Sequence, residues 1–267
     1  METFERSITP ENQEKYGRNI TLVVDLIRHP EKDYATGNLK EEGKEAFIQK
    51  LREEYADEQF DTIKGYVSPL KRGQQAIEPL SKFLEENDID TTIRTKDELV
   101  GKMNQYSSET DVIMDEILRE RNLLDMGKSQ KDDALEPVSK DEEALKNEIL
   151  IKEFFDKEFP GISLKGEDVA QELDGLIQHF SKMSKRFLSD SKVKIIAVGH
   201  SGIIEYLTKL VYLQNHPEIA PKDVGVEQIE GLLDYMSGPR ITISSDENGK
   251  QTATFEYKDL SLRYALK

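Results

Sequence analysis

The sequence predicts an α/β fold: a three-layer α/β/α sandwich with a mostly parallel sheet, an antiparallel C-terminal edge hairpin and a helical cap insertion. Three apolar runs, at residues 22–27, 62–67 and 193–198, are each followed by a helical pattern. That alternation is typical of strands in a parallel sheet. Two β-rich runs near the C-terminus flank a turn sequence, which indicates a hairpin.

We expect residues 1–267 to form a single domain, with residues 98–166 inserted as a helical cap over the strand ends. A chain of this length can bury one large core. The insertion has no strand pattern, and its helical patterns at 108–125 and 139–159 each open with the capping-box sequence Ser-x-x-Asp/Glu. An acidic helical arm that does not pack on the domain is the alternative interpretation.

The elements expected before the cap alternate between short β-rich runs and amphipathic segments. Apolar residues recur every three or four positions in the helices, and β-branched residues are frequent in the strands. Asp25 is unusual, because it places a carboxylate inside the first apolar run. The predicted elements are a strand at 22–27, a helix at 39–55, a strand at 62–67, a helix at 72–86 and a strand at 91–95.

The elements expected after the cap continue this alternation and then close the sheet. The turn Asp246-Glu-Asn-Gly249 separates the last two runs and favours a β-hairpin. The predicted elements are a helix at 166–188, a strand at 193–198, helices at 202–213 and 226–236, and hairpin strands at 240–244 and 251–257.

Charge and composition limit the partners. The formal net charge is −16, which argues against nucleic acid or an anionic membrane as a partner, because both attract basic surfaces. Without cysteine, the chain has no thiol nucleophile and no zinc-thiolate site. The N-terminal residues lack the apolar core of a signal peptide, and no segment has the roughly 20 apolar residues of a membrane helix. We therefore expect a cytoplasmic protein.

The three parallel strands end in residues that suit an anion. Arg28 and His29 follow the first, the loop from Ser68 to Arg72 follows the second, and His200 follows the third. Ligands of open α/β sheets bind outside the carboxyl ends of the strands, where helix N-termini offer N–H groups to anions. Two histidines and two arginines at one sheet edge predict a phosphate site.

These motifs resemble those of the histidine phosphatase superfamily, which has the phosphoglycerate-mutase-like fold. The matching stretches are Arg28-His29, Ser68-Pro-Leu-Lys-Arg72 with Gln75, and Gly199-His200-Ser201-Gly202. Leu39-Lys-Glu-Glu-Gly43 is similar to the family's Leu-Thr-x-x-Gly helix start, and the resemblance spans roughly residues 20–260. Pro30 stands where the family usually has glycine, and the Asn/Thr-containing extension of the mutase branch is absent.

The resemblance implies a metal-independent phosphomonoester hydrolase without a cofactor. His29 would attack phosphorus and form a phosphohistidine, which water then hydrolyses. Arg28 and Arg72 would bind the phosphoryl oxygens in fork geometry, and His200 would donate to the same oxygens. Lys32 would be a further phosphate contact. The resemblance implies a phosphorylated substrate, and we expect that substrate to be a small molecule.

The leaving group needs a proton, for which two glutamates are candidates. Many family members carry a general acid shortly after the strand that follows the second arginine, and Glu98 occupies that place. Glu31, two residues after the nucleophile, is the alternative.

Other functions remain open at this point. A non-catalytic phosphate-binding scaffold on the same fold and a phosphoglycerate-type mutase are the alternatives. Gly-His-Ser-Gly also resembles the Gly-x-Ser-x-Gly elbow of α/β-hydrolases, but Ile203 stands where that motif needs glycine. Ser201 therefore fits a helix N-cap better than a nucleophile. We expect His179 and His216 to be structural or exposed.

Overall fold

The computed structural model of the chain describes residues 15–33, 36–56, 58–87, 89, 92–100 and 165–267. The helical patterns predicted at 108–125 and 139–159 lie outside the described residues, so the cap stays a prediction. Leu99 and Val100, which we assigned to the start of the insertion, are buried in the main core.

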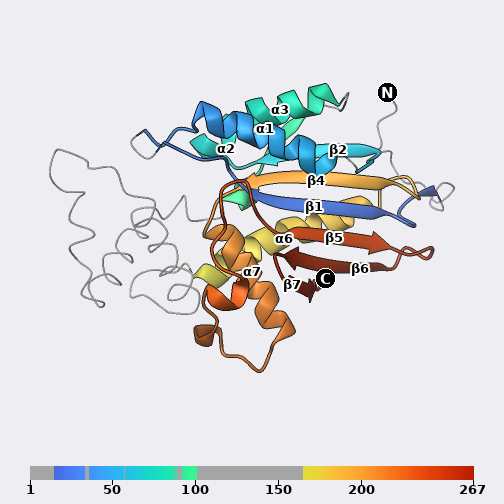
Figure 1. The fold of residues 1–267 in the computed structure, drawn as a ribbon. Coiled ribbons are helices and arrows are strands. Elements are labelled where there is room, and N and C mark those ends of the chain that lie inside the picture. The colour runs from blue at the N-terminus through green and yellow to red at the C-terminus, as the bar shows by residue number, and fades with distance from the viewer. Residues whose placement is uncertain (1–14, 34–35, 57, 88, 90–91, 101–164) are drawn as a thin grey trace.

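The described residues form a seven-stranded sheet in the order β3-β2-β4-β1-β5-β6-β7 (Figure 1). The first four strands in this order are parallel to one another, and β5, β6 and β7 continue the sheet in antiparallel pairs. The predicted parallel sheet with an antiparallel C-terminal edge is confirmed. The strands are β1 Thr21–Arg28, β2 Thr62–Val67, β3 Ile93–Thr95, β4 Lys192–Gly199, β5 Arg240–Ser245, β6 Gln251–Tyr257 and β7 Leu260–Arg263.

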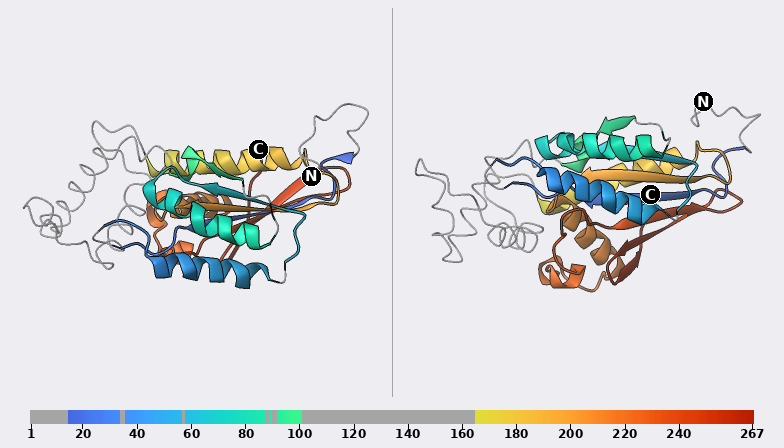
Figure 2. Two further views of the ribbon diagram at one scale, coloured as in Figure 1. Left: turned by 90° about the horizontal axis from the view of Figure 1, so that it is seen from above. Right: turned by 45° about the horizontal axis from the view of Figure 1, so that its top comes forward.

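Helices cover both faces of the sheet, which confirms the three layers. Helices α1 and α3 contact each other on one face, and α6 and α7 contact each other on the other (Figure 2). The helices are α1 Glu41–Tyr55, α2 Lys71–Gln75, α3 Ile77–Glu86, α6 Gly166–Ser184 and α7 Ile203–Asn215, with short 3₁₀ turns η2 Asp97–Leu99, η7 Pro221–Asp223 and η8 Glu227–Ile229. None of the helices in the described ranges is long and apolar enough to cross a membrane.

The alternation of side chains along β1 divides the core in two. Leu22, Val24 and Leu26 pack with the α6 and α7 side of the molecule, whereas Ile27 packs with the α1 and α3 side. Asp25 has the same parity as Ile27, so its carboxylate points into the layer between the sheet and α1.

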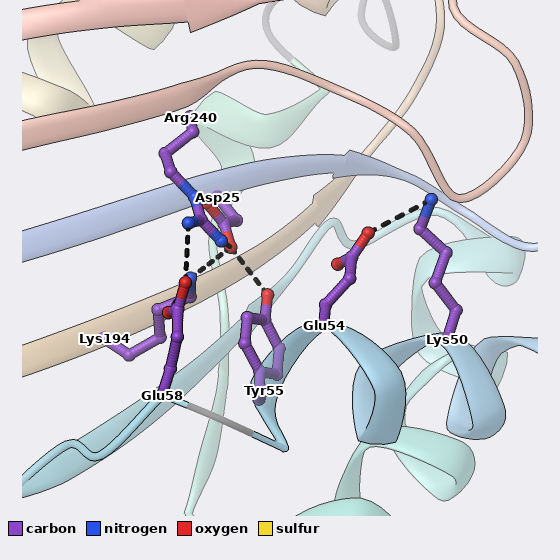
Figure 3. A network of polar contacts seen from close by, with 7 residues as sticks. All are labelled: Asp25, Lys50, Glu54, Tyr55, Glu58, Lys194 and Arg240. Atoms are coloured by element: carbon purple, nitrogen blue, oxygen red, sulfur yellow. Dashed lines mark hydrogen bonds and ion pairs between the residues drawn. The ribbon is translucent and has the colours of Figure 1, made fainter.

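A buried ion network accounts for Asp25 (Figure 3). Its carboxylate accepts hydrogen bonds from the Tyr55 hydroxyl at 2.6 Å and from Arg240 Nε at 2.9 Å, and it pairs with Lys194 Nζ. Arg240 Nη1 also donates to Glu58 Oε1 at 2.8 Å. Burial raises the pKa of Asp25, but the positive charges of Lys194 and Arg240 outweigh it and hold that pKa below the ordinary value. The network joins α1 to three neighbouring strands.

The helix predicted at 72–86 is two helices, α2 and α3, which meet at Ala76. The cause is Pro79, which has no N–H to donate to the carbonyl of Gln75, four residues earlier. The Ala76 N–H instead lies 3.2 Å and 3.1 Å from the carbonyl oxygens of Arg72 and Gly73, as in a tightened last turn.

The helix predicted at 226–236 is wrong. The structure has only the short η8 there, because Glu230 and Gly231 both adopt positive φ angles, 63° and 81°. The following residues run beside the end of β1: Arg28 N–H donates to the Ser237 carbonyl at 2.9 Å, and Met236 N–H donates to the Arg28 carbonyl at 3.0 Å. A Cβ atom on Gly238 would lie 1.7 Å from the Leu26 carbonyl oxygen, so only glycine permits this approach.

Candidate active site

Strand pairing brings the predicted site residues to one edge of the sheet. Arg28 pairs with Gly199 across β1 and β4, and Val67 pairs with Val198 across β2 and β4. The three loops therefore leave three adjacent strands at the same level. Two backbone bonds continue the ladders: His29 N–H donates to the Gly199 carbonyl, and Ser68 N–H donates to the Val198 carbonyl, each at 3.0 Å.

His29 is buried and held in one tautomer. Its Nδ1 lies 2.7 Å from the Pro30 carbonyl oxygen. A carbonyl oxygen only accepts, so Nδ1 carries the hydrogen and Nε2 has the free electron pair. Burial, followed by the charges of His200 and Arg72, lowers the pKa of His29 to about 2, so the ring is neutral near pH 7. Pro30 contributes its carbonyl oxygen, which proline and glycine offer equally.

His200 faces His29, with ring centroids 5.0 Å apart and an interplanar angle of 58°. Its Nε2 lies 2.6 Å from Ser68 Oγ, and its Nδ1 is buried without a hydrogen-bond partner among the described residues. Burial lowers the pKa of His200 to about 3, and the charges of Arg72, Arg28 and Lys32 add to the effect. This ring is therefore neutral as well, and its Nδ1 can donate to a ligand when the Ser68 hydroxyl donates to Nε2.

Arg28 is buried beside the two histidines and held from two sides. Its Nη1 donates to the Leu233 carbonyl at 2.6 Å, and its guanidinium carbon lies 4.0 Å from the centroid of the Tyr235 ring. The same Tyr235 ring lies 5.8 Å from that of His29. Contact with an aromatic face keeps the guanidinium in one plane while it stays charged.

Arg72 reaches the site because its helix packs directly on Ser68. A Cβ atom on Gly73 would lie 2.2 Å from Ser68 Oγ and 2.5 Å from the Ser68 carbonyl oxygen, so this position has no room for a side chain. Gln74 Nε2 donates to the same carbonyl at 2.8 Å. Arg72 is half-buried in the first turn of α2, and its charge lowers the pKa of both His29 and His200.

Taken together, three cations act on two neutral imidazoles. Arg28, Arg72 and Lys32 are the groups whose charges lower the pKa of His200, so each lies within electrostatic range of it. An electropositive centre with neutral rings favours a dianion, because the ligand's charge would offset the repulsion among the cations. The arrangement suits a phosphoryl group.

The two candidate acids differ in their surroundings. Glu98 lies in η2, partly exposed, and η2 packs beside the end of β4: the carbonyl oxygen of Leu99 is 3.3 Å from where a Cβ of Gly199 would lie. Glu31 instead forms an ion pair with Lys40 at 2.6 Å. The acid role of either glutamate stays a prediction.

Two motif residues have structural contacts of their own. Gln75 Oε1 accepts the Leu39 N–H and Gln75 Nε2 donates to Asn38, both at 3.0 Å, so it fixes the loop after β1. Ser201 is not the N-cap of α7. That position is Gly202, whose φ of 90° disfavours other residues, and Ser201 Oγ donates to Glu205 Oε1 at 2.6 Å.

Sequence reasoning did not single out Leu233, Tyr235 or Glu205. Leu233 and Tyr235 lie in the stretch for which we predicted a helix, and their apolar spacing gave no other signal.

His179 is exposed on α6, and His216 ends α7 with its ring centroid 4.4 Å from that of Tyr212. Among the residues that the structure describes, no group of three or more histidine or acidic side chains could hold a metal ion.

No protein-family model and no curated protein matches the chain. Solved structures of similar shape include one titled Mycobacterial hydrolase 2, with 11% identity, 93% of each chain covered and a TM-score of 0.47. A native mycobacterial glucosyl-3-phosphoglycerate phosphatase shares 12% identity over 88% of this chain and 96% of its own, with a TM-score of 0.45. The complex of that phosphatase with inorganic phosphate shares 12% identity over 91% of this chain and 97% of its own, also with a TM-score of 0.45. Each of these TM-scores is below 0.5, so these similarities establish neither the fold nor the activity of this chain.

Proposed function

We propose that the chain is a phosphomonoester hydrolase of the histidine phosphatase type, which works without a metal ion through a phosphohistidine on His29. The observation that carries the proposal is a buried, neutral His29 whose Nδ1–H is bound to the Pro30 carbonyl. Its Nε2 is thereby left nucleophilic beside Arg28, Arg72 and His200.

In the first proposed step, His29 Nε2 attacks phosphorus in line with the ester oxygen. The N–P bond forms, the P–O bond breaks, and its electron pair leaves with the alkoxide, which takes a proton from the acid that we assign to Glu98, with Glu31 as the alternative. The imidazole becomes positive during this step. The Pro30 carbonyl, which already accepts from Nδ1–H at 2.7 Å, stabilises that charge.

The transferring phosphoryl group needs its oxygens held as it flattens. Arg28 and Arg72 supply guanidinium forks for this purpose, and Lys32 adds a further positive charge. His200 donates from Nδ1 if Ser68 Oγ–H donates to its Nε2, because a neutral imidazole carries one hydrogen. The orphaned, buried Nδ1 supports this assignment.

In the second step, water attacks the phosphohistidine. The acid residue, now a carboxylate, takes the water proton, a new P–O bond forms and the N–P bond breaks. The electron pair returns to Nε2, and phosphate leaves. The histidine is regenerated neutral, so the cycle consumes only the ester and water. We expect the physiological substrate to be a phosphorylated small molecule.

The test is hydrolysis of p-nitrophenyl phosphate in excess EDTA by wild type, His29→Ala and the matched control His179→Ala. We expect turnover in wild type and in the control, whose histidine is exposed on α6, and no turnover in His29→Ala. Metal-dependent turnover that survives His29→Ala would overturn the proposal. Phosphate binding without any turnover would instead indicate a scaffold, and net phosphoryl transfer to an added alcohol phosphate would indicate a mutase.

A further inference from the structure

A buried carboxylate behind the site joins two of its loops. Glu205, in the first turn of α7, is 1% exposed. Its Oε2 accepts the Gly202 N–H at 2.6 Å, and its Oε1 accepts the Ser201 hydroxyl at 2.6 Å and the Leu233 N–H at 3.1 Å. Two of these bonds hold the loop that follows His200. The third reaches a segment 28 residues further along the chain.

That segment holds Arg28. The peptide unit of Leu233 is bound on both sides: its N–H donates to Glu205, and its carbonyl accepts Arg28 Nη1 at 2.6 Å. Two residues on, the Tyr235 ring covers the guanidinium at 4.0 Å. An unbroken series of contacts therefore runs from the His200 loop through Glu205 and Leu233 to Arg28.

A local helix cap would not need this third bond. Glu205 satisfies the start of α7 through its bond to the Gly202 N–H alone. Here the carboxylate is buried, which is costly unless its hydrogen bonds are complete. The bond to Leu233 adds a third partner to the carboxylate and also fixes the backbone that orients Arg28.

We propose that Glu205 is a positioning residue for the phosphate site, which sets the orientation of Arg28 through Leu233 and keeps it in register with His200. The inference rests on the proposed function, since it assumes that Arg28 binds a phosphoryl group. Guanidinium forks bind phosphate well only at the correct angle, so a small rotation of Arg28 weakens the complex.

Glutamine cannot replace Glu205, although the two have the same shape. All three partners in this network donate, and an amide offers one acceptor oxygen and one NH₂ group. In one orientation the NH₂ group faces the Gly202 N–H, and in the other it faces the Leu233 N–H. Either way one buried donor loses its partner, and we expect the Leu233 segment to shift.

The experiment measures binding of inorganic phosphate by titration calorimetry, so that it does not depend on turnover. We expect Glu205→Gln to weaken phosphate binding about tenfold, and Arg28→Lys to weaken it about as much. If Glu205 acts through Arg28, adding Glu205→Gln to Arg28→Lys should weaken binding less than about twofold further. A merely structural role would give the same loss in both backgrounds.

The matched control is Asp174→Asn on α6. Asp174 is also a buried carboxylate, 3% exposed, and accepts from Tyr264 and Lys267 away from the site. It should lower stability without changing phosphate affinity. Should Glu205→Gln fail to fold, Glu205→Asp keeps the charge but shortens its reach, and the same non-additivity with Arg28→Lys is expected.

The possible results separate the two proposals. Wild-type affinity in Glu205→Gln, or additive losses in the double variant, would overturn the positioning role while leaving hydrolysis intact. Phosphate binding without turnover in wild type would overturn hydrolysis but leave the positioning role standing on the binding data. Wild-type protein that neither binds phosphate nor hydrolyses the ester would overturn both.

Discussion

The two histidines of the site are kept neutral by their surroundings. Burial and the nearby arginine charges lower the pKa of His29 to about 2 and that of His200 to about 3, against an ordinary value of 6.5. A proton would add positive charge where Arg28 and Arg72 already lie. The proposed nucleophile is therefore ready over the whole physiological pH range without a separate general base.

We expect neither ring to titrate between pH 5 and 8 in the ligand-free protein. The acid limb of kcat/KM should instead follow the second ionisation of the phosphate ester, near pH 6. Histidine ring signals in proton–carbon NMR spectra, assigned with His29→Ala and with His200→Ala, measure the first expectation. A midpoint near 6.5 for either ring would contradict it, because the lowered pKa values place protonation below about pH 3.

At the residue scale, the strand ends could be predicted and their supports could not. Arg28, His29 and His200 lie at the ends of apolar runs, and Arg72 follows the second run by five residues, a pattern visible in the sequence. The sequence has 53 acidic residues, and nothing in it distinguishes Glu205 from the others. Its role depends on a backbone N–H brought to it by tertiary folding.

At the element scale, the short helix α2 depends on one glycine. Replacing Gly73 with alanine would place a Cβ 2.2 Å from Ser68 Oγ, which contacts His200, and 2.5 Å from the Ser68 carbonyl oxygen. Rotation of the Ser68 side chain leaves the second contact in place, so α2 must also move and carry Arg72 with it. We expect Gly73→Ala to cost about 1–3 kcal/mol of unfolding free energy and to lower kcat/KM by more than that loss of folded protein explains. Urea unfolding and p-nitrophenyl phosphate kinetics measure the two effects.

The control for that change is Gly175→Ala on α6. A Cβ there meets nothing within 4 Å, so the substitution adds helix propensity without a clash. We expect it to leave kcat/KM unchanged and to stabilise the protein by up to about 1 kcal/mol. Equal effects of the two substitutions would show that the contact with Ser68 is unimportant.

The predicted element boundaries agree with the structure in most places. They are wrong where hydrogen bonds between distant parts of the chain determine the backbone conformation. The strands at 62–67 and 251–257 agree with β2 and β6 to the residue. In the stretch 226–236, apolar spacing fits a helix, but the backbone of Met236 and Ser237 bonds to β1 instead. The small strand β7 was not predicted, since four residues of mixed polarity carry little pattern.

At the scale of the whole molecule, the Asp25 network ties α1 to the sheet. Asp25→Asn would leave Lys194, which has no exposed surface, with only the Glu58 carboxylate, whose Oε2 lies 3.6 Å from Nζ. The substitution should cost about 3 kcal/mol of unfolding free energy at pH 7. Because folding lowers the pKa of Asp25, this contribution is present above its unfolded value of 3.8 and is lost as the pH falls below it.

Urea unfolding of wild type and Asp25→Asn at pH 7 and pH 3 measures that difference, which should shrink at the lower pH. Glu54→Gln is the matched control, since Glu54 pairs with Lys50 at 3.2 Å near the same network but is partly exposed (Figure 3). Its cost should stay below about 1 kcal/mol. A constant gap between wild type and Asp25→Asn across this pH range would mean that folding does not lower the pKa of Asp25.

The sheet order has a consequence for how the protein is made. Within the described sheet, β1 lies between β4 and β5, so the strand synthesised first has both neighbours more than 160 residues later in the chain. A ribosome adding about 5–20 residues per second needs on the order of ten seconds to reach them. Until then Leu22, Val24 and Leu26 have no sheet to join, and Arg28 and His29 belong to a nascent chain without a phosphate site. Synthesis of residues 192–245 is therefore the step in which the central strand β1 gains both neighbours and the proposed site is completed.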